Sequence, residues 1–423
     1  MNHLLIRASL PAAALMILAP ALMAQRAVEL PPRDRTLNVQ LEDVYAVGAF
    51  DGADWETFGE IRQVAFDGEG NLHVLDVQTS RMVVVDPTGR FVRMWGQAGE
   101  GPGEWRNAAG AAVFRDGTVA IADMGHGAVQ LFDWEGSYLG AAPLRDGGMV
   151  RVGQLQPDPR GGALFNGGGS TMMSMSFDGS GPPPELPPGR PIERIRLGDD
   201  PRKELFHQAW QAPRPEAGEM NAGGVRVRMV FEPRTFEPAL HTAVLADGGL
   251  AVVDSSAWVV KILDADGREV RRLTRAIAPT PVTDRIRQGE IERQLAELES
   301  GEGPRMRIVT NDGGGAREMP REQVNQLMRD RIRNRGFYPE IAVTRRMASG
   351  WEGLLWLERA RVNPDEPGPI DVFTAEGTYR GTIAPDGPRI PDAFGPDGLV
   401  AYIERGELDV PRVVVKRLSE GVR

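Results

Sequence analysis

The 423-residue sequence contains no cysteine. Disulfide frameworks, thiol nucleophiles and cysteine-ligated zinc or iron–sulfur centres are therefore excluded. Histidine is also scarce, at five residues, and no two have the spacing of a histidine-rich zinc site. Neither a phosphate-binding loop nor a Gly-x-Ser-x-Gly nucleophile motif occurs. The formal net charge of −10 argues against a nucleic-acid partner.

Long apolar runs are absent beyond the N-terminus. Residues 1–24 combine a short basic start, an apolar stretch and small residues before Gln25, which is typical of a signal peptide cleaved after Ala24. An uncleaved anchor is the alternative, but the run is short and contains two prolines. We therefore expect export to the periplasm or the extracellular space, with no stable membrane insertion after cleavage. Residues 25–36 are predicted to form a flexible lead-in.

Glycine and proline are abundant, at 51 and 33 residues, but they follow no Gly-X-Y period. Their positions indicate tight turns within a repeat. Residues 61–95, 108–139 and 240–273 share one order of features: an apolar strand, an Asp-Gly turn, a strand ending in Asp, a third apolar strand and a second Gly turn. Such a unit is a four-stranded antiparallel sheet that cannot bury both faces alone, so copies must stack around an axis.

Six copies account for most of the chain and predict an all-β, six-bladed β-propeller as a single domain over residues 37–423. A spare strand at residues 37–48 would close the ring outside the last blade. Residues 150–235 form the most degenerate copy, and seven blades are possible if residues 203–231 form a sheet of their own. The expected blades cover residues 60–95, 107–140, 150–235, 239–275, 340–384 and 391–418.

Two motifs carry a resemblance to a known family. Residues 96–105 read GQAGEGPGEW, and Asp76 is followed by Arg81 five residues on. The first motif is similar to the linker between blades in NHL repeats and related six-bladed propellers of exported bacterial proteins. The second motif is similar to the D-x-x-x-x-R step of the same repeats. The resemblance implies a propeller fold. Some six-bladed relatives are metal-dependent lactonases or lyases, which implies an enzyme as one alternative.

Residues 281–337 interrupt the β pattern. Thr283 can cap a helix that carries an apolar stripe, and Pro320 suits the first position of a second amphipathic helix. We expect a helical insertion of two helices. They could pack on each other and on a propeller face as a structural cap, or they could form a lid or partner-docking surface over the channel mouth.

The candidate site is the mouth of the central channel, by analogy with other propellers. Polar residues near the start of each expected innermost strand could bind an anionic or polyhydroxylated ligand, or a hard cation, or could simply line a water-filled channel. The candidate ligand-binding residues are Glu60, Arg62, Gln63, Asn107, Arg151, His241, Glu340, Arg345 and Asp392.

Two functions follow from this site. The favoured hypothesis is a monomeric, non-catalytic binding module for a protein, peptide or glycan, with no catalytic residue, metal or cofactor. The alternative is an enzyme with an axial divalent cation, for which calcium is a possible ion. There Glu60, Asn107, Asp392 and His241 would be ligands, and Arg62 would orient a substrate carboxylate.

Overall fold

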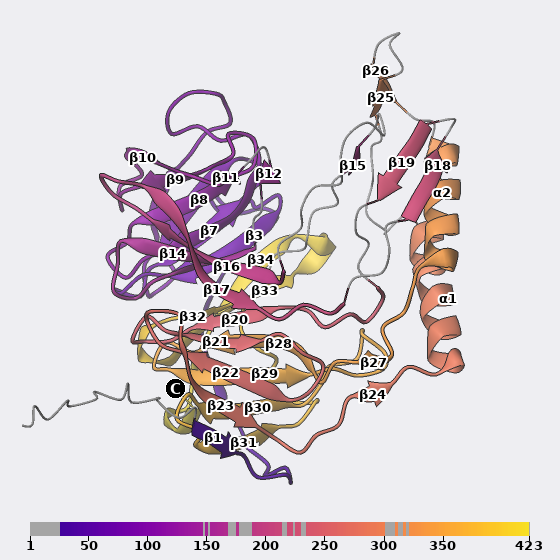
Figure 1. The fold of residues 1–423 in the computed structure, drawn as a ribbon. Coiled ribbons are helices and arrows are strands. Elements are labelled where there is room, and N and C mark those ends of the chain that lie inside the picture. The colour runs from indigo at the N-terminus through magenta and orange to yellow at the C-terminus, as the bar shows by residue number, and fades with distance from the viewer. Residues whose placement is uncertain are drawn as a thin grey trace, which may run out of the picture.

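The computed structural model describes residues 26–146, 149–150, 153–167, 175–176, 188–213, 218–222, 225–229, 234–300, 309–311, 316–318 and 321–422. Six sheets, each with four antiparallel strands of one blade, dominate the fold (Figure 1). Innermost strands of neighbouring sheets contact one another, and β32 of the last sheet contacts β3 of the first. The chain is therefore a six-bladed β-propeller, which confirms the fold predicted from the repeats. The expected signal peptide, residues 1–24, lies outside the described residues.

From the channel outward, the strands of each blade are as follows. Blade 1 contains β3 (Ile61–Phe66), β4 (Leu72–Asp76), β5 (Arg81–Val85) and β6 (Phe91–Trp95). Blade 2 contains β7 (Ala108–Val113), β8 (Val119–Asp123), β9 (Ala128–Phe132) and β10 (Tyr138–Pro143). Blade 3 contains β13 (Gln154–Pro157), β14 (Ala163–Gly167), β16 (Arg190–Arg196) and β17 (Arg202–Ala209).

The remaining blades follow the same order. Blade 4 contains β20 (His241–Val244), β21 (Leu250–Val253), β22 (Val259–Leu263) and β23 (Glu269–Thr274). Blade 5 contains β28 (Thr344–Ser349), β29 (Leu354–Arg359), β30 (Ile370–Thr374) and β31 (Tyr379–Ile383). Blade 6 contains β32 (Ala393–Phe394), β33 (Leu399–Arg405), β34 (Pro411–Leu418) and, outermost, β2 (Leu41–Val47).

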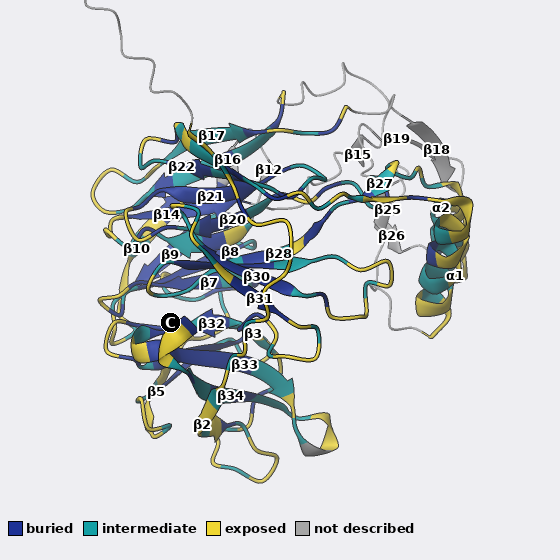
Figure 2. Ribbon diagram, turned by 90° about the horizontal axis from the view of Figure 1, so that it is seen from below, coloured by how far each residue is buried: buried dark blue, intermediate teal, exposed yellow. Residues whose placement is uncertain are grey.

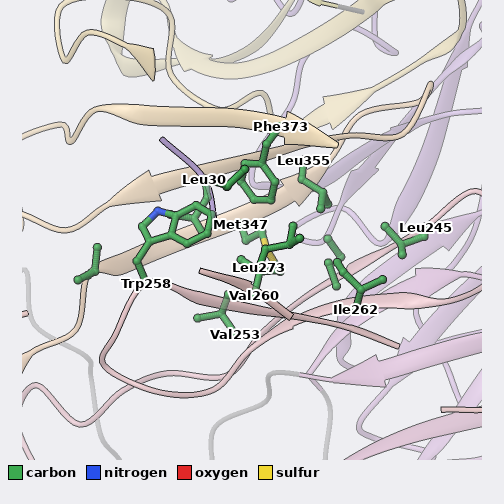
Figure 3. Close-up of a cluster of buried hydrophobic side chains, with 14 residues drawn as sticks. Leu30, Leu245, Val253, Trp258, Val260, Ile262, Leu273, Met347, Leu355 and Phe373 are labelled. Atoms are coloured by element: carbon green, nitrogen blue, oxygen red, sulfur yellow. The ribbon is translucent and has the colours of Figure 1, made fainter. Parts of the chain in front are cut away.

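The cores of the molecule lie between neighbouring blades. Every residue of the second strands β4, β8 and β21 is buried, because each blade is covered on both faces by its neighbours. Figure 3 shows one such core, in which Trp258 and Ile262 of blade 4 meet Met347 and Phe373 of blade 5. Figure 2 shows the buried residues concentrated in the blades. Burial on both faces explains why these strands are continuous apolar runs rather than alternating ones.

The N-terminal segment follows the outer edges of three successive blades, and we call residues 26–47 the N-terminal belt. Strand β1 (Arg26–Glu29) adds in parallel to β23 of blade 4. The backbone N–H of Leu37 then donates to Thr382 of blade 5 at 2.9 Å. Finally β2 pairs antiparallel with β34 of blade 6, which joins the two ends of the described chain in one sheet.

The expectation of a flexible lead-in at residues 25–36 is therefore wrong for the part that the structure describes. Leu30 is only 1 % exposed and belongs to the core between blades 4 and 5. Asp34 accepts hydrogen bonds from Arg275 and Arg359, at 2.8 and 2.7 Å. Distant partners hold this segment in an extended form, and its proline- and arginine-rich composition does not reveal them.

Blade 3 takes only part of the residues 150–235 that were expected to form it. Its outer strands are β16 and β17, whereas β15 (Met175–Ser176) pairs outside the blade with β19 (Val225–Met229). Strand β19 also pairs with β18 (Gly218–Ala222). Since residues 202–209 complete blade 3, the seventh blade considered for residues 203–231 does not form. Two further short ladders pair β11 (Arg145–Asp146) with β12 (Met149–Val150), just before blade 3, and β25 (Val309–Asn311) with β26 (Ala316–Glu318), between blades 4 and 5.

The helical insertion connects blade 4 to blade 5. It contains α1 (Asp284–Ser300) and α2 (Arg321–Asn334), and the pairing of β24 (Thr280–Pro281) with β27 (Glu340–Ile341) closes its base. The two helices pack on each other, and both views place them to one side of the six blades (Figures 1 and 2). Because the insertion ends where β28 begins, it lies on the side of the propeller at which the innermost strands start. Three short 3-10 turns complete the structure, at Pro396–Gly398, Glu407–Asp409 and Glu420–Val422.

Candidate functional site

A cavity of about 290 Å³ lies on the axis of the propeller. Its lining comes from the innermost strand of every blade or the residues beside it, so one site draws on six separate parts of the chain. The walls combine apolar side chains with a small set of polar ones, the composition expected of a small-molecule pocket. The polar and charged lining residues are Gln63, Arg115, Gln154, Gln156, Asp158, His241, Thr242, Arg346, Ser349 and Asp392.

Buried aspartates fix where the innermost strands begin. Asp76, at the end of β4, accepts hydrogen bonds from the backbone N–H groups of Gly59 and Glu60 at 3.1 and 3.0 Å. Asp123, at the end of β8, accepts from the N–H of Asn107 at 3.1 Å. Burial alone would raise the pKa of both aspartates, but hydrogen bonds lower it below the usual value. The backbone N–H groups do so for Asp76, and for Asp123 the His126 side chain does so first and the backbone N–H groups second. In blades 1 and 2 the repeated Asp is therefore a structural group that holds the segment leading into the innermost strand.

Two glutamines in the cavity wall connect neighbouring blades. The Gln63 side chain accepts a hydrogen bond from the N–H of Ala111 in blade 2, at 2.9 Å. The Gln156 side chain accepts from the N–H of Val244 in blade 4 at 2.9 Å and donates to the carbonyl of Thr242 at 3.0 Å. Both side-chain amides therefore fix the spacing of neighbouring innermost strands around the channel.

Of the nine predicted site residues, the structure brings three into the cavity wall: Gln63, His241 and Asp392. Asp392 accepts hydrogen bonds from Arg389 at 2.7 Å and from the N–H of Ile403 at 2.8 Å. The His241 Nε2 atom is buried and has no hydrogen-bond partner. Burial, followed by the nearby Arg190 guanidinium, lowers the pKa of His241 to about 4, so the imidazole is neutral at physiological pH.

Five predicted residues lie outside the cavity lining. Glu60 and Arg62 are exposed and form an ion pair with each other at 2.7 Å. Asn107 is exposed, and Glu340 accepts a hydrogen bond from the Ser256 hydroxyl. Arg345 points away from the channel toward Glu358, at 3.1 Å. The ninth residue, Arg151, lies outside the described residues.

A recurrent bulge explains why Arg62 and Arg345 lie outside the cavity lining. The ladder register shifts between Ile61 and Gln63 in β3, and between Thr344 and Arg346 in β28. The residue inside each bulge turns outward, so the channel receives the next one along the chain. Arg346 therefore lines the cavity in place of Arg345. The signal in the sequence was the alignment of the repeats, which places Gln63 and Arg346 at equivalent positions.

The charged residues of the cavity wall are two arginines, Arg115 and Arg346, and two aspartates, Asp158 and Asp392. The Asp392 carboxylate is shared by Arg389, at 2.7 Å, and Arg346, at 3.6 Å. Arg190 lies behind His241 and donates to the backbone carbonyls of Trp210, Pro238 and Asp254, at 2.6 to 2.9 Å. Burial lowers the pKa of Arg190, and the nearby Asp254 and Glu237 carboxylates oppose this shift, so its charge is partly balanced.

The ligand set expected for an axial cation is not assembled. Of the four expected ligands, only His241 and Asp392 line the cavity. Across the described ranges, no three His, Asp or Glu side chains are grouped as a metal ion would require. In the same part of the chain, no helix is both long and apolar enough to cross a membrane.

The fold and the axial cavity define the class of protein, a six-bladed β-propeller. No family model matches the chain, and no curated protein matches it. Among solved structures, it is similar to a candidate exported protein from Bacteroides fragilis, at 10% identity and a TM-score of 0.46, covering 93% of this chain and 99% of that one.

Two further propellers are similar in fold. Regucalcin from Agrobacterium tumefaciens, a calcium-binding protein, has 12% identity and a TM-score of 0.36, covering 93% of this chain and 96% of that one. Virginiamycin B lyase from Staphylococcus aureus has 10% identity and a TM-score of 0.37, covering 90% of this chain and 100% of that one. At these values the likeness assigns no activity to the present chain.

Proposed function

We propose that this protein is an exported, non-catalytic binding module that holds part of a peptide or glycan in the mouth of its axial channel. The observation that supports the proposal is the set of polar side chains in the cavity wall. They are amides, hydroxyls, a neutral imidazole, two guanidiniums and two carboxylates, which bind ligands through hydrogen bonds. The two His–Asp pairs of the described chain, His73 with Asp67 and His126 with Asp123, both lie outside the cavity lining.

Rigidity also favours a binding role. The cavity wall is built from strands whose positions are fixed by the Gln63 and Gln156 bridges between blades. A preorganised wall reduces the conformational entropy lost when a ligand binds. The insertion between blades 4 and 5 stands on the same side of the propeller as the mouth, where it can extend the surface that a larger ligand meets.

A blocked channel tests this function. Ala348 lines the cavity, and a phenylalanine there would fill much of the space. Ala141, on the exposed outer strand β10, offers a matched control for the same substitution. We expect ligands found by calorimetric screening of short peptides and oligosaccharides to bind the wild type and Ala141→Phe equally, and to lose binding to Ala348→Phe. Equal binding to both variants would place the site elsewhere.

Export is tested separately. Expression of the full chain in a bacterial host should deliver the protein to the periplasm or the medium, with a mature N-terminus at Gln25 determined by mass spectrometry. Retention of residues 1–24 on a membrane-bound product would contradict the proposed cleavage.

A further inference from the structure

We propose that a second cavity, between blades 2 and 3, binds a neutral ligand through an aromatic ring. Its volume of about 500 Å³ exceeds the volume of about 290 Å³ of the axial cavity and is typical of a small-molecule pocket. The wall comes from the turns between β7 and β8 and between β13 and β14, the outer strand β10, and the turn after β16. Because the first two turns follow the ends of innermost strands, the cavity lies on the face of the propeller opposite the helical insertion. This second site is independent of the function proposed for the axial cavity.

At two other junctions between blades, an aromatic ring fills the corresponding space. Trp95, on the outer strand of blade 1, covers the turn glycine Gly136 of blade 2, where a Cβ would lie 2.4 Å from the indole ring. Tyr45, on the outer strand of blade 6, covers Gly89 of blade 1, where a Cβ would lie 2.7 Å from the phenol ring. Both glycines lie in the turn between the third and fourth strands of their blade. The fold therefore seats aromatic rings between the outer strand of one blade and this turn of the next.

Strand β10 presents small residues to blade 3. Ala142 belongs to the hydrophobic core between blades 2 and 3, and Gly140, on the same side of the strand, lines the cavity. The Tyr138 ring packs instead on Phe132, which belongs to the core between blades 1 and 2. A Cβ at Gly140, or at Gly198 in the turn between β16 and β17, would have no atom within 4 Å. This junction therefore has open space where the two others hold a ring.

Apolar side chains line the space that a ring would occupy. Phe114 and Leu131 belong to the core between blades 2 and 3, Leu197 packs against it, and all three line the cavity. Leu139 lines it too but is 58% exposed, which places this leucine at the opening. A ring that covers these side chains gains hydrophobic free energy, and the Phe114 ring offers it an aromatic contact. The wall therefore favours a flat apolar group over a polar one.

The charged side chains of the wall favour a neutral ligand. They are Arg115, Arg160, Asp116, Asp158 and Asp199. Asp158 has no exposed surface and accepts hydrogen bonds from Arg160, at 2.8 and 3.0 Å, and from Arg194, at 2.7 Å. The Asp116 carboxylate accepts from the backbone N–H of Thr118 within its own turn, at 3.0 Å. Two cations beside three anions leave no surplus of positive charge for an anionic ligand, and a cationic ligand would meet both guanidiniums.

Two leucines of blade 3 provide matched variants. Leu197→Trp places an indole of the chain itself in the cavity wall, whereas Leu205→Trp makes the same change on β17, at a position that is 63% exposed and outside the lining. Leu139→Ser removes an apolar side chain from the opening, and its exposed position makes it a second variant that should fold whether or not Leu197→Trp does. The melting temperature of each variant shows that it is folded.

The probes separate an aromatic ring from other apolar groups. Indole and benzamide are neutral aromatic molecules, and cyclohexanecarboxamide is the saturated counterpart of benzamide. N-acetyltryptophanamide carries its ring as a peptide side chain would. NMR titrations of the mature chain measure the binding of all four.

We expect indole to bind the wild type and Leu205→Trp equally, and to bind Leu197→Trp at least about tenfold more weakly, because the introduced ring fills the space. Leu139→Ser should weaken indole about threefold, and benzamide should bind at least about threefold more tightly than cyclohexanecarboxamide, the effect of one aromatic pair. Ala348→Phe, which narrows the axial cavity, should leave indole binding unchanged. Binding of N-acetyltryptophanamide as well as indole would identify a peptide side chain as the source of the ring, and binding of indole alone would identify a free small molecule.

Three results would overturn the second site: no binding of indole and benzamide to the wild type, equal binding of benzamide and cyclohexanecarboxamide, or equal losses in the two leucine-to-tryptophan variants. Loss of indole binding in Ala348→Phe alone would place the ring in the axial cavity, which contradicts the second site and leaves the proposed function standing.

Discussion

Replacing Arg275 with methionine would test whether the N-terminal belt is locked to the propeller by a buried charge. The Arg275 side chain has no exposed surface and donates to Asp371, also fully buried, at 2.7 Å. It also donates to Asp34 at 2.8 Å and to the carbonyl of Pro31 at 2.8 Å, both in the belt. Methionine preserves much of the volume but leaves the Asp371 carboxylate without its closest cation.

The expected cost follows from the loss of that close ion pair, since only the Arg359 guanidinium, 3.7 Å away, then remains beside Asp371. Breaking a buried ion pair by removing one partner destabilises a protein by about 3–5 kcal/mol. This is a large part of the roughly 5–15 kcal/mol that stabilises a typical native state. Trp258 and Thr382 still donate to Asp371, at 2.8 and 2.7 Å, which argues for the lower half of that range. The belt should also become accessible to proteases near residues 31–36.

Urea unfolding followed by tryptophan fluorescence measures the free-energy change. Asp34→Asn is the control, because Asp34 is half exposed and its loss should cost about 1 kcal/mol or less. The double variant Arg275→Met/Asp371→Leu should recover part of the lost stability, since it removes the buried charge altogether. If Arg275→Met unfolds within about 1 kcal/mol of the wild type, Asp371 does not depend on this arginine, and the reasoning fails.

Two other predictions concern pH and packing. The pKa of His241 is lowered to about 4 in the folded protein, so its contribution to the free energy of unfolding should be full above pH 6.5 and fall by about 2 kcal/mol between pH 7 and 5. In urea titrations, His241→Gln should flatten this pH dependence. His126 has the opposite sign, since Asp123 raises its pKa, so His126→Gln should lose stability mainly at low pH; a matching slope in both variants would contradict the assignment. Gly136 and Gly198 both have positive φ, but a Cβ at Gly136 would lie 2.4 Å from Trp95, whereas a Cβ at Gly198 would have no atom within 4 Å. Gly136→Ala should therefore lower the melting temperature clearly more than Gly198→Ala. Equal effects would show that backbone strain alone decides the cost.

The repeats made the blades predictable because each blade is a local structure. Turns such as the one at Gly117 and apolar runs such as Val83–Val85 recur with the sequence, and no distant contact is needed to recognise them. Six blades followed from that pattern. The degenerate third blade was harder, because its strands β14 and β16 are separated by a long insertion and pair across it.

The candidate site was only partly predictable for two physical reasons. A bulge of one residue decides whether Arg345 or Arg346 faces the channel, and single-sequence periodicity does not show it. The ordering of the lead-in depends on distant partners such as Arg359, which lies 325 positions from Asp34, and a proline-rich segment has the same composition whether or not such partners exist.

The N-terminal belt has a consequence for how the chain folds. Its β2 strand pairs with β34, and the Lys416 side chain donates to Asp43 across 373 positions of sequence, at 2.5 Å. Contacts between residues this far apart in the sequence cost a large loop-closure entropy and form late. During synthesis, β2 therefore stays unpaired until the last blade is available. With no cysteine to fasten the junction, ring closure should be the final and slowest step of folding, and a chain cut short before β34 would expose a ring open at both edges.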